Sequence, residues 1–213
     1  ALTTKAYDGL KEGREIQLND KDIDVTSNEY PNIVDDVGAT IQQQGNTVNL
    51  GENYVSTQMQ GVYPNEIRIN KKEMLHGRFI NDIDLKERRK VIVMGSDDAK
   101  ELWGGNIKDF IGKHVNVGKM AFMVVGIYKS DKSGRNTSIY TPFTTFRTIY
   151  NKGDKTDRIV FSFHGLPTEK ANEEFEKNYL ARLNGNHRAA PDDEGAIWIW
   201  NRFTQSMQMN TGI

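Results

Sequence analysis

The sequence contains no cysteine in its 213 residues. This absence excludes disulfide bonds, thiolate metal sites and cysteine nucleophiles together. It leaves the cellular compartment open, because a cysteine-free domain folds on either side of a membrane. An excess of charge is missing as well, since 28 Lys and Arg face 29 Asp and Glu, for a formal net charge of −1. A nucleic-acid partner, which requires a broad basic face, is therefore not expected.

Long apolar runs are also missing. No stretch approaches the roughly 20 apolar residues of a transmembrane helix, and the polar start at Ala1–Lys5 has no signal-peptide pattern. With 37% hydrophobic and 27% charged residues, the composition is that of a globular chain able to bury a sizeable core. The chain starts without Met and ends at Gln205–Ile213 without a stop signal. We therefore expect a piece of a longer protein.

Catalytic motifs are absent from the sequence. It has neither a G-x-x-x-x-G-K-[ST] phosphate loop nor a G-x-G-x-x-G loop, so the chain is not itself an ATPase. It also lacks the G-x-S-x-G nucleophile elbow. No two histidines have the spacing that places two metal ligands on one helix face; they are His76, His114, His164 and His187. We predict no catalytic residue, no cofactor site and no metal site.

Groups of acidic residues do not change this prediction. Adjacent carboxylates usually point apart, and those in the first turn of a helix are favoured by the helix dipole. The groups are Asp35-Asp36, Asp82 with Asp84, Asp97-Asp98 and Asp192-Asp193-Glu194. The Asp20–Asp24 segment has the spacing of an EF-hand start, but Val25 and Pro31 stand where that loop needs Gly and Glu. Calcium binding is therefore not expected.

Periodicity and turn residues predict a mixture of helices and strands. A helix through Asp22–Val25 is capped by Asn19 or Asp20, a short one spans 144–150, and the clearest one spans 168–184 and ends at Gly185. Strands are predicted at 33–44, 47–50, 54–63, 158–163 and 195–200, with a turn at Gly45-Asn46. In the last strand, Trp198 and Trp200 are either buried or placed at a membrane interface, where tryptophan is enriched.

The stretch from Gly77 to Tyr128 is the most informative part of the chain. It predicts a buried strand ending at Gly95, a brief helix with Ser96 as N-cap and Gly104-Gly105 as stop, and a two-stranded β unit. Its motifs occur in a fixed order: Gly77-Arg78-Phe79 with Asp82, Val91–Gly95, Leu102-Trp103-Gly104, Ile111-Gly112-Lys113, Phe122–Gly126 and Ile139-Tyr140-Thr141-Pro142.

In the order and spacing of these motifs the chain resembles the extracytoplasmic domain of MacB-type ABC transporter permeases, which include relatives of LolC and FtsX. Trp103 departs from the commoner Phe, and a proline before Ile111 is missing. The resemblance implies an α+β fold. A ferredoxin-like (βαββαβ-type) porter lobe would be formed by residues 1–85 and 143–213, and residues 86–142 would form a smaller inserted lobe.

The resemblance also implies a function. The domain would be non-enzymatic and would couple cytoplasmic ATP hydrolysis to conformational work on a periplasmic substrate or partner, in an efflux or export system. It would lie on the periplasmic face of the bacterial inner membrane, between flanking transmembrane helices. Its partners would be a second permease copy, a cytoplasmic ATPase, and a periplasmic adaptor with an outer-membrane channel. No residue is assigned to contact with substrate or partner.

Two other functions stay open from the sequence. The first is a stand-alone binding or adhesion module that captures a ligand with an exposed sheet edge. The second is a hydrolase with an unrecognised site, which predicts a cleft that gathers His164 or His114 with carboxylates.

Overall fold

The computed structural model describes residues 1–131 and 138–201, and these divide into two compact units. Unit 1 comprises Ala1–Val37 and Phe161–Ile213, and unit 2 comprises Gly38–Val160. Both boundaries fall within strands, the long β1 (Val34–Leu50) and the shorter β8 (Arg158–Phe163). The inserted lobe predicted at residues 86–142 lies wholly within unit 2, which begins earlier and ends later. Helices and paired strands together make the fold α+β, as predicted.

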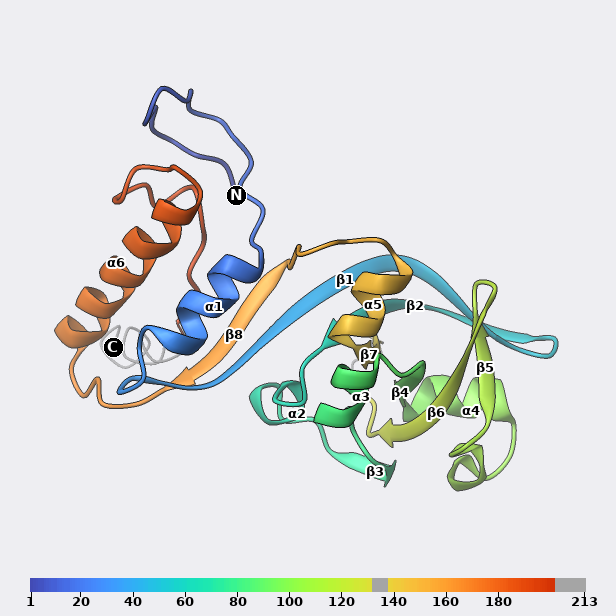
Figure 1. Cartoon of the computed structure of the whole chain (residues 1–213). Helices are drawn as coiled ribbons and strands as arrows, with labels where there is room; N and C mark the ends of the chain where they lie inside the picture. The colour runs from blue at the N-terminus through green and yellow to red at the C-terminus, as the bar shows by residue number, and fades with distance from the viewer. Residues whose placement is uncertain (132–137, 202–213) are drawn as a thin grey trace, which may run out of the picture. The chain divides into compact units, whose positions relative to one another are not determined.

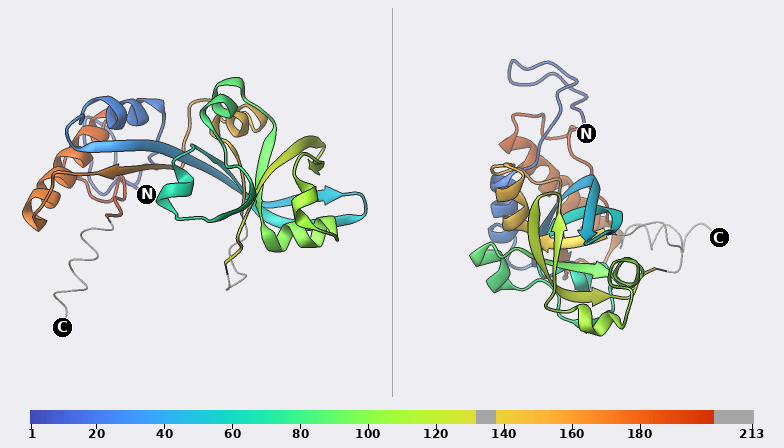
Figure 2. Two further views of the ribbon diagram at one scale, coloured as in Figure 1. Left: turned by 90° about the horizontal axis from the view of Figure 1, so that it is seen from below. Right: turned by 90° about the vertical axis from the view of Figure 1, so that its right-hand side faces the viewer.

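Six strands of unit 2 close into a ring of pairings, in the order β1-β2-β7-β4-β6-β5 and back to β1 (Figures 1 and 2). The β2–β7 and β4–β6 pairs are parallel, and the other four pairs are antiparallel. A further strand, β3, extends the β6 edge beyond β5. The remaining strands are β2 (Asn53–Val62), β3 (Met74–Gly77), β4 (Val91–Gly95), β5 (His114–Val117), β6 (Met120–Tyr128) and β7 (Ser138–Pro142).

Short helices cover this ring of strands. α4 packs on β2, β4 and β6, and α5 packs on β2 and β7 beside α3 (Figure 1). Thr145 Oγ1 donates to the Arg89 carbonyl at 2.8 Å, which ties α5 to the second residue after α3. The helical segments are α2 (Glu66–Ile69), α3 (Asp82–Glu87), α4 (Ser96–Trp103), the 3-10 helix η1 (Ile107–Phe110) and α5 (Phe143–Ile149).

The turn predicted at Gly45-Asn46 is wrong, because β1 continues through it. The pairing with β2 shifts register between Gln43 and Asn46, which is a β-bulge. Gly45 has a φ of +72°, and Asn46 Nδ2 donates to the Gln43 carbonyl at 2.7 Å. A glycine followed by asparagine suits a bulge as well as a chain reversal, since both need a left-handed residue.

Unit 1 is built on two helices, α1 (Asp20–Asn28) and α6 (Glu169–Asn186), which pack side by side (Figure 1). Both were predicted, although α6 continues through the predicted stop at Gly185 to Asn186. Asn19 is the N-cap of α1 in a capping box. The apolar stripe of α6 is buried at Phe175, Tyr179 and Leu183. Phe161 of β8 meets the Phe175 and Tyr179 rings edge-on, with centroids 6.3 and 5.4 Å apart. These aromatic side chains form the centre of this core.

The strand predicted at residues 195–200 is not present. Ile197 is buried in the unit 1 core and Ile199 packs against it, whereas Trp198 and Trp200 are 80% and 76% exposed. The alternation of apolar and aromatic residues is thus real, but the segment has no ladder partner in the described chain. Burial of the two tryptophans, one of the two interpretations above, is excluded.

Of the two predicted ends of helix α4, the start is wrong by one residue and the stop is confirmed. Gly95, not Ser96, is the N-cap residue, and Ser130 Oγ accepts the Asp97 amide at 2.9 Å in place of a local cap. The predicted stop is confirmed, because Gly104 is the C-cap with a left-handed φ of +73°.

We expect Gly104→Ala to lower the free energy of unfolding by about 1 kcal/mol, because a side chain at positive φ is strained. Gly105→Ala is the matched control. A Cβ at Gly105 would meet the Trp103 ring at 3.5 Å, an ordinary contact, so a change within about 0.5 kcal/mol is expected. Urea denaturation of the two variants measures both values. Equal effects would contradict the role assigned to Gly104.

Candidate functional site

The four histidines do not gather into one site. His164 Nδ1 lies 2.9 Å from an Asp35 carboxylate oxygen, but both side chains are about half exposed. His187 Nε2 lies 2.7 Å from Asp22 Oδ2 inside unit 1, where it links the end of α6 to α1. His76 and His114 lie in β3 and β5. Within residues 1–131 and 138–201, no group of three or more His, Asp or Glu side chains is arranged to hold a metal ion.

The acidic groups have separate structural roles. Asp193 is buried and accepts the Thr4 and Lys5 amides at 2.8 and 3.1 Å, and Asp192 pairs with Lys5 at 2.7 Å. Together they fasten the start of the chain to the end of unit 1. Burial acts to raise the pKa of Asp193, but the hydrogen bonds from the Thr4 hydroxyl and the backbone amides together outweigh it and lower the pKa.

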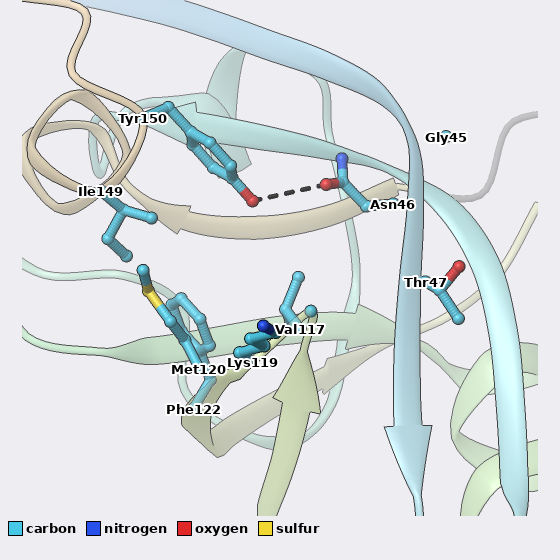
Figure 3. Close-up of a pocket in the computed structure, with 10 residues that line it drawn as sticks. Gly45, Asn46, Thr47, Val117, Lys119, Met120, Phe122, Ile149 and Tyr150 are labelled. Atoms are coloured by element: carbon cyan, nitrogen blue, oxygen red, sulfur yellow. Dashed lines mark hydrogen bonds between the residues drawn. The ribbon is translucent and has the colours of Figure 1, made fainter.

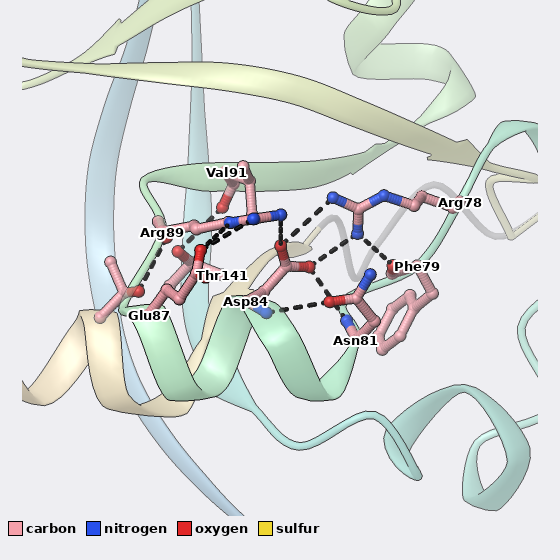
Figure 4. A network of polar contacts seen from close by, with 9 residues as sticks. Arg78, Phe79, Asn81, Asp84, Glu87, Arg89, Val91 and Thr141 are labelled. Carbon is pink, nitrogen blue, oxygen red and sulfur yellow. Dashed lines mark hydrogen bonds and ion pairs between the residues drawn. The ribbon is translucent and has the colours of Figure 1, made fainter.

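Asp84 lies at the centre of the best-connected polar network in unit 2 (Figure 4). Its side chain is fully buried and receives two hydrogen bonds from Arg78, at 2.6 and 3.2 Å. Arg89 lies 3.7 Å from the same carboxylate, and the Asn81 amide donates to it at 3.0 Å. Arg78 also donates to the Phe79 carbonyl at 3.0 Å. The network fixes the loop between β3 and α3.

This network revises one detail of the Gly-Arg-aromatic motif. Asp82 was the acidic residue singled out from the sequence, but Asp84 is the one that holds Arg78. Asp82 is exposed in the first turn of α3. Both acids follow the arginine closely, and only the direction of each side chain on the helix separates their roles.

Two motif glycines allow β3 to approach β6 closely. A Cβ at Gly77 would lie 2.1 Å from the Val125 carbonyl oxygen, and a Cβ at Gly126 would lie 2.0 Å from the Arg78 carbonyl oxygen. At the same point the Arg78 amide N–H donates a hydrogen bond to the Val125 carbonyl oxygen at 2.9 Å. Any side chain at either glycine would push these backbones apart. The motif residues therefore build a rigid corner of unit 2, with the Asp84 network attached to it.

An open recess lies at the turn between β5 and β6, with a volume of about 370 Å³ (Figure 3). Its wall is mostly apolar, from Val117, Met120, Phe122 and Ile149, with Lys119 as the charged group. The Tyr150 hydroxyl donates to Asn46 Oδ1 at 3.3 Å, and burial raises its pKa, which keeps it protonated. The lining is mostly apolar and contains no carboxylate and no histidine.

Sequence analysis did not predict this recess. Its residues come from β1, the β5–β6 turn and the end of α5, which are three segments far apart in the sequence. The one sequence feature that could have pointed to the recess is an apolar residue at a turn. Met120 directly follows Gly118-Lys119 and is 37% exposed.

Asp98 is a buried acid without a partner. It is 7% exposed in the first turn of α4, and its Oδ2 atom has no hydrogen-bond partner in the structure. Burial raises its pKa to about 6, and the nearby charges of Glu101 and Asp97 act in the same direction. The Asp97-Asp98 pair was predicted to benefit from the helix dipole; for Asp98, loss of solvation is the larger effect.

Comparison with known proteins identifies the family. The family described as the MacB-like periplasmic core domain matches residues 3–178. A curated relative, the macrolide export ATP-binding/permease protein MacB of Bdellovibrio bacteriovorus, is 29% identical over 115 residues. These cover 54% of this chain and 17% of the relative, so the chain spans about a sixth of that protein's length.

Solved structures agree on the fold. The periplasmic region of MacB from Actinobacillus actinomycetemcomitans has a TM-score of 0.75 and 17% identity, covering 100% of this chain and 92% of that one. The extracellular domain of the noncanonic ABC-type transporter YknZ from Gram-positive bacteria has a TM-score of 0.69 and 18% identity, covering 83% and 87%.

No helix in the described ranges is both long and apolar enough to cross a membrane. The match over residues 3–178 covers most of the chain, and it includes every motif from Gly77 to Pro142 on which the resemblance was based. The chain belongs to the family of MacB-like periplasmic core domains.

Proposed function

We propose that this domain transmits movement in an ABC transporter permease, coupling ATP hydrolysis in the cytoplasm to work on a periplasmic substrate or partner. The observation that carries the proposal is the family match over residues 3–178. The work would be mechanical and of the efflux or export type. The domain would act without an enzymatic site or a cofactor of its own.

The construction of unit 2 supports a mechanical role. Its six ring strands each have a neighbour on both sides, and glycine contacts and the Asp84 network stiffen the β3–α3 corner. A closed ring of strands moves as one body, which suits an element that passes on displacement. The ring strands themselves have no open edge, so the alternative of a stand-alone module that binds through a sheet edge is left with β3 and β8.

The hydrolase alternative has less support. It requires a cleft that gathers His164 or His114 with carboxylates. His164 does pair with Asp35, but on an exposed surface, and the recess described above contains neither histidine. A general base needs a nucleophile or bound substrate within reach in a site that excludes water.

The proposed partners follow from the family. They are a second permease copy, a cytoplasmic ATPase acting through the transmembrane helices, and a periplasmic adaptor with an outer-membrane channel. Flanking apolar spans would anchor the domain at the periplasmic face of the inner membrane. Nucleic acid is not among the proposed partners, because the formal net charge is only −1.

Cysteine labelling tests the proposed location. Because this chain contains no cysteine, Tyr54→Cys in the full-length protein adds one reactive thiol at a 67% exposed position. We expect a membrane-impermeant maleimide to label it in intact cells after the outer membrane is made permeable. Labelling only after the inner membrane is broken would contradict the proposal.

The matched control is Val93→Cys, at a fully buried position of β4. The buried thiol of Val93→Cys should react with the maleimide only after denaturation. Such a result would show that labelling of Tyr54→Cys reports the exposure of a folded domain and not damage to the cells. The unsubstituted protein supplies the background from thiols elsewhere in the full-length chain.

A further inference from the structure

The recess between β1, the β5–β6 turn and the end of α5 is bounded by backbone that is fixed in place (Figure 3). Val117 and Met120 are paired across the turn. Gly118 follows Val117 with a φ of +60°, which a two-residue hairpin turn needs at its first central position. The Gly118 amide donates to the Thr47 carbonyl oxygen at 3.4 Å, so the turn is joined to β1 just after its bulge. The fold itself therefore forms the recess, as is usual for small-molecule pockets.

The lining offers an apolar surface to a ligand. Phe122 and Val117 are buried. Ile149 is half-buried, and Met120 is 37% exposed. The volume of about 370 Å³ lies within the range of roughly 300–1,000 Å³ that is typical of small-molecule pockets. Because the Met120 side chain is unbranched and flexible, it can adjust to an alkyl chain that lies against it.

The charge at the recess is positive and unpaired. Lys119 is the only charged residue of the lining, and it is exposed at the tip of the turn. Among residues 1–131 and 138–201 its ammonium group has no ion-pair partner. Asn46, by contrast, is already engaged, because its Nδ2 donates to the Gln43 carbonyl and its Oδ1 accepts from Tyr150. With a free ammonium group and no carboxylate in the lining, the recess favours an anion over a cation.

We propose that this recess is a binding site for an amphiphilic carboxylate, a saturated fatty acid of medium chain length. The alkyl chain lies against the four apolar lining residues, and the carboxylate pairs with Lys119 at the tip of the turn. One lysine matches the single charge of a carboxylate better than the nearly doubled charge of a phosphate group. Binding at the recess is independent of the proposed function, because every lining residue belongs to unit 2 and neither a membrane nor a second protein is required.

Octanoate, octanol and octylamine test this proposal, because they share a chain length and differ in charge. Each is titrated, below any micelle-forming concentration, into the 213-residue chain labelled with ¹³C at the methionine methyl groups. The Met120 methyl signal, assigned with Met120→Leu, reports the recess, and the Met94 signal from the buried strand β4 is the internal reference. We expect octanoate to move the Met120 signal saturably and to leave Met94 unchanged. Its affinity should be about fivefold higher than that of octanol and about tenfold higher than that of octylammonium.

Three variants separate the ion pair from the apolar contact. Lys119→Gln should weaken octanoate binding about fivefold and leave octanol binding unchanged. Lys100→Gln is the matched control, at an exposed position of α4 outside the lining, and should change neither affinity. Ile149→Ala removes part of the apolar wall, so it should weaken octanoate and octanol severalfold and to the same extent.

Four results would overturn the proposal. The first is a Met120 signal that none of the ligands moves, and the second is joint movement of Met94 and Met120, which indicates detergent action on the whole fold. The third is equal affinity for octanoate and octanol, or a higher affinity for octylammonium. The fourth is octanoate binding that Lys119→Gln and Lys100→Gln affect equally.

Discussion

Replacing Asp84 by Ala is expected to lower the free energy of unfolding by about 3–4 kcal/mol. The carboxylate is fully buried and holds Arg78 through two hydrogen bonds, Arg89 through an ion pair, and the Asn81 amide through the capping box. Removing it leaves two arginines without their shared carboxylate and removes one of the two hydrogen bonds of the α3 capping box, while the Asn81 side chain still caps the helix. Thermal or urea unfolding of the purified chain measures the loss.

The matched control is Asp82→Ala, two residues away in the first turn of the same helix. Asp82 is exposed, so its loss should cost only about 0.5 kcal/mol, through the helix dipole. Arg78→Lys gives a second check, because a lysine cannot make the bidentate contact and should lose part of the same energy. Similar costs for the Asp82 and Asp84 variants would show that the network does not stabilise unit 2.

Replacing Asp98 by Asn is expected to raise the free energy of unfolding, and the size of this gain should depend on pH. Burial raises the pKa of Asp98 from 3.8 to about 6 in the folded chain, so the folded state holds this proton more tightly than the unfolded state. Stability therefore falls as the pH rises from about 4 to about 6, and the cost is complete above pH 6. At pH 8 the amide should raise the free energy of unfolding by about 2 kcal/mol, whereas at pH 4 the two proteins should be nearly equal.

Urea titrations of Asp98→Asn and of the parent chain at pH 4, 6 and 8 measure this difference. Asp97→Asn is the neighbouring control, since Asp97 is exposed and its replacement should change the free energy of unfolding by less than about 0.5 kcal/mol at each pH. A stabilisation by Asp98→Asn that is the same at pH 4 and pH 8 would contradict the assignment of the cost to a buried charge.

Local signals in the sequence predicted the helices well. The cap at Asn19, the stop at Gly104 and the apolar stripe through Phe175, Tyr179 and Leu183 are all present in the structure. Each is encoded within one or two turns of chain, so composition and spacing suffice to find it. The same holds for β5 and β6, where Val115, Val117, Phe122 and Val124 are buried as their alternation predicted.

Predictions that depend on distant contacts were less accurate. Residues 195–200 alternate like a strand, but no neighbouring strand is available to them in the described chain, so they pack on unit 1 without a ladder. The continuation of β1 past Gly45 depends on β2, which keeps pairing on both sides of the bulge. A strand is defined by its partner, and a single segment does not encode where that partner lies.

The polar network shows the same limit at the level of side chains. The sequence contains Arg78 and two acids close behind it, and the choice between Asp82 and Asp84 depends on how α3 is oriented toward β3. The recess beside Tyr150 combines three separate segments, and its shape exists only once the ring of strands has closed. Family resemblance, by contrast, depends on the order of motifs along the chain and was available from the sequence.

The coupling of ATP hydrolysis to movement of this domain is the central claim, and one distance measurement tests it most directly. A spin label on Tyr54→Cys in the full-length protein, reconstituted in lipid nanodiscs, reports the separation between two copies. The account predicts a measurable distance distribution that shifts when a non-hydrolysable ATP analogue binds. A distribution that is identical with and without the analogue, or no dipolar signal between labels at all, would contradict it.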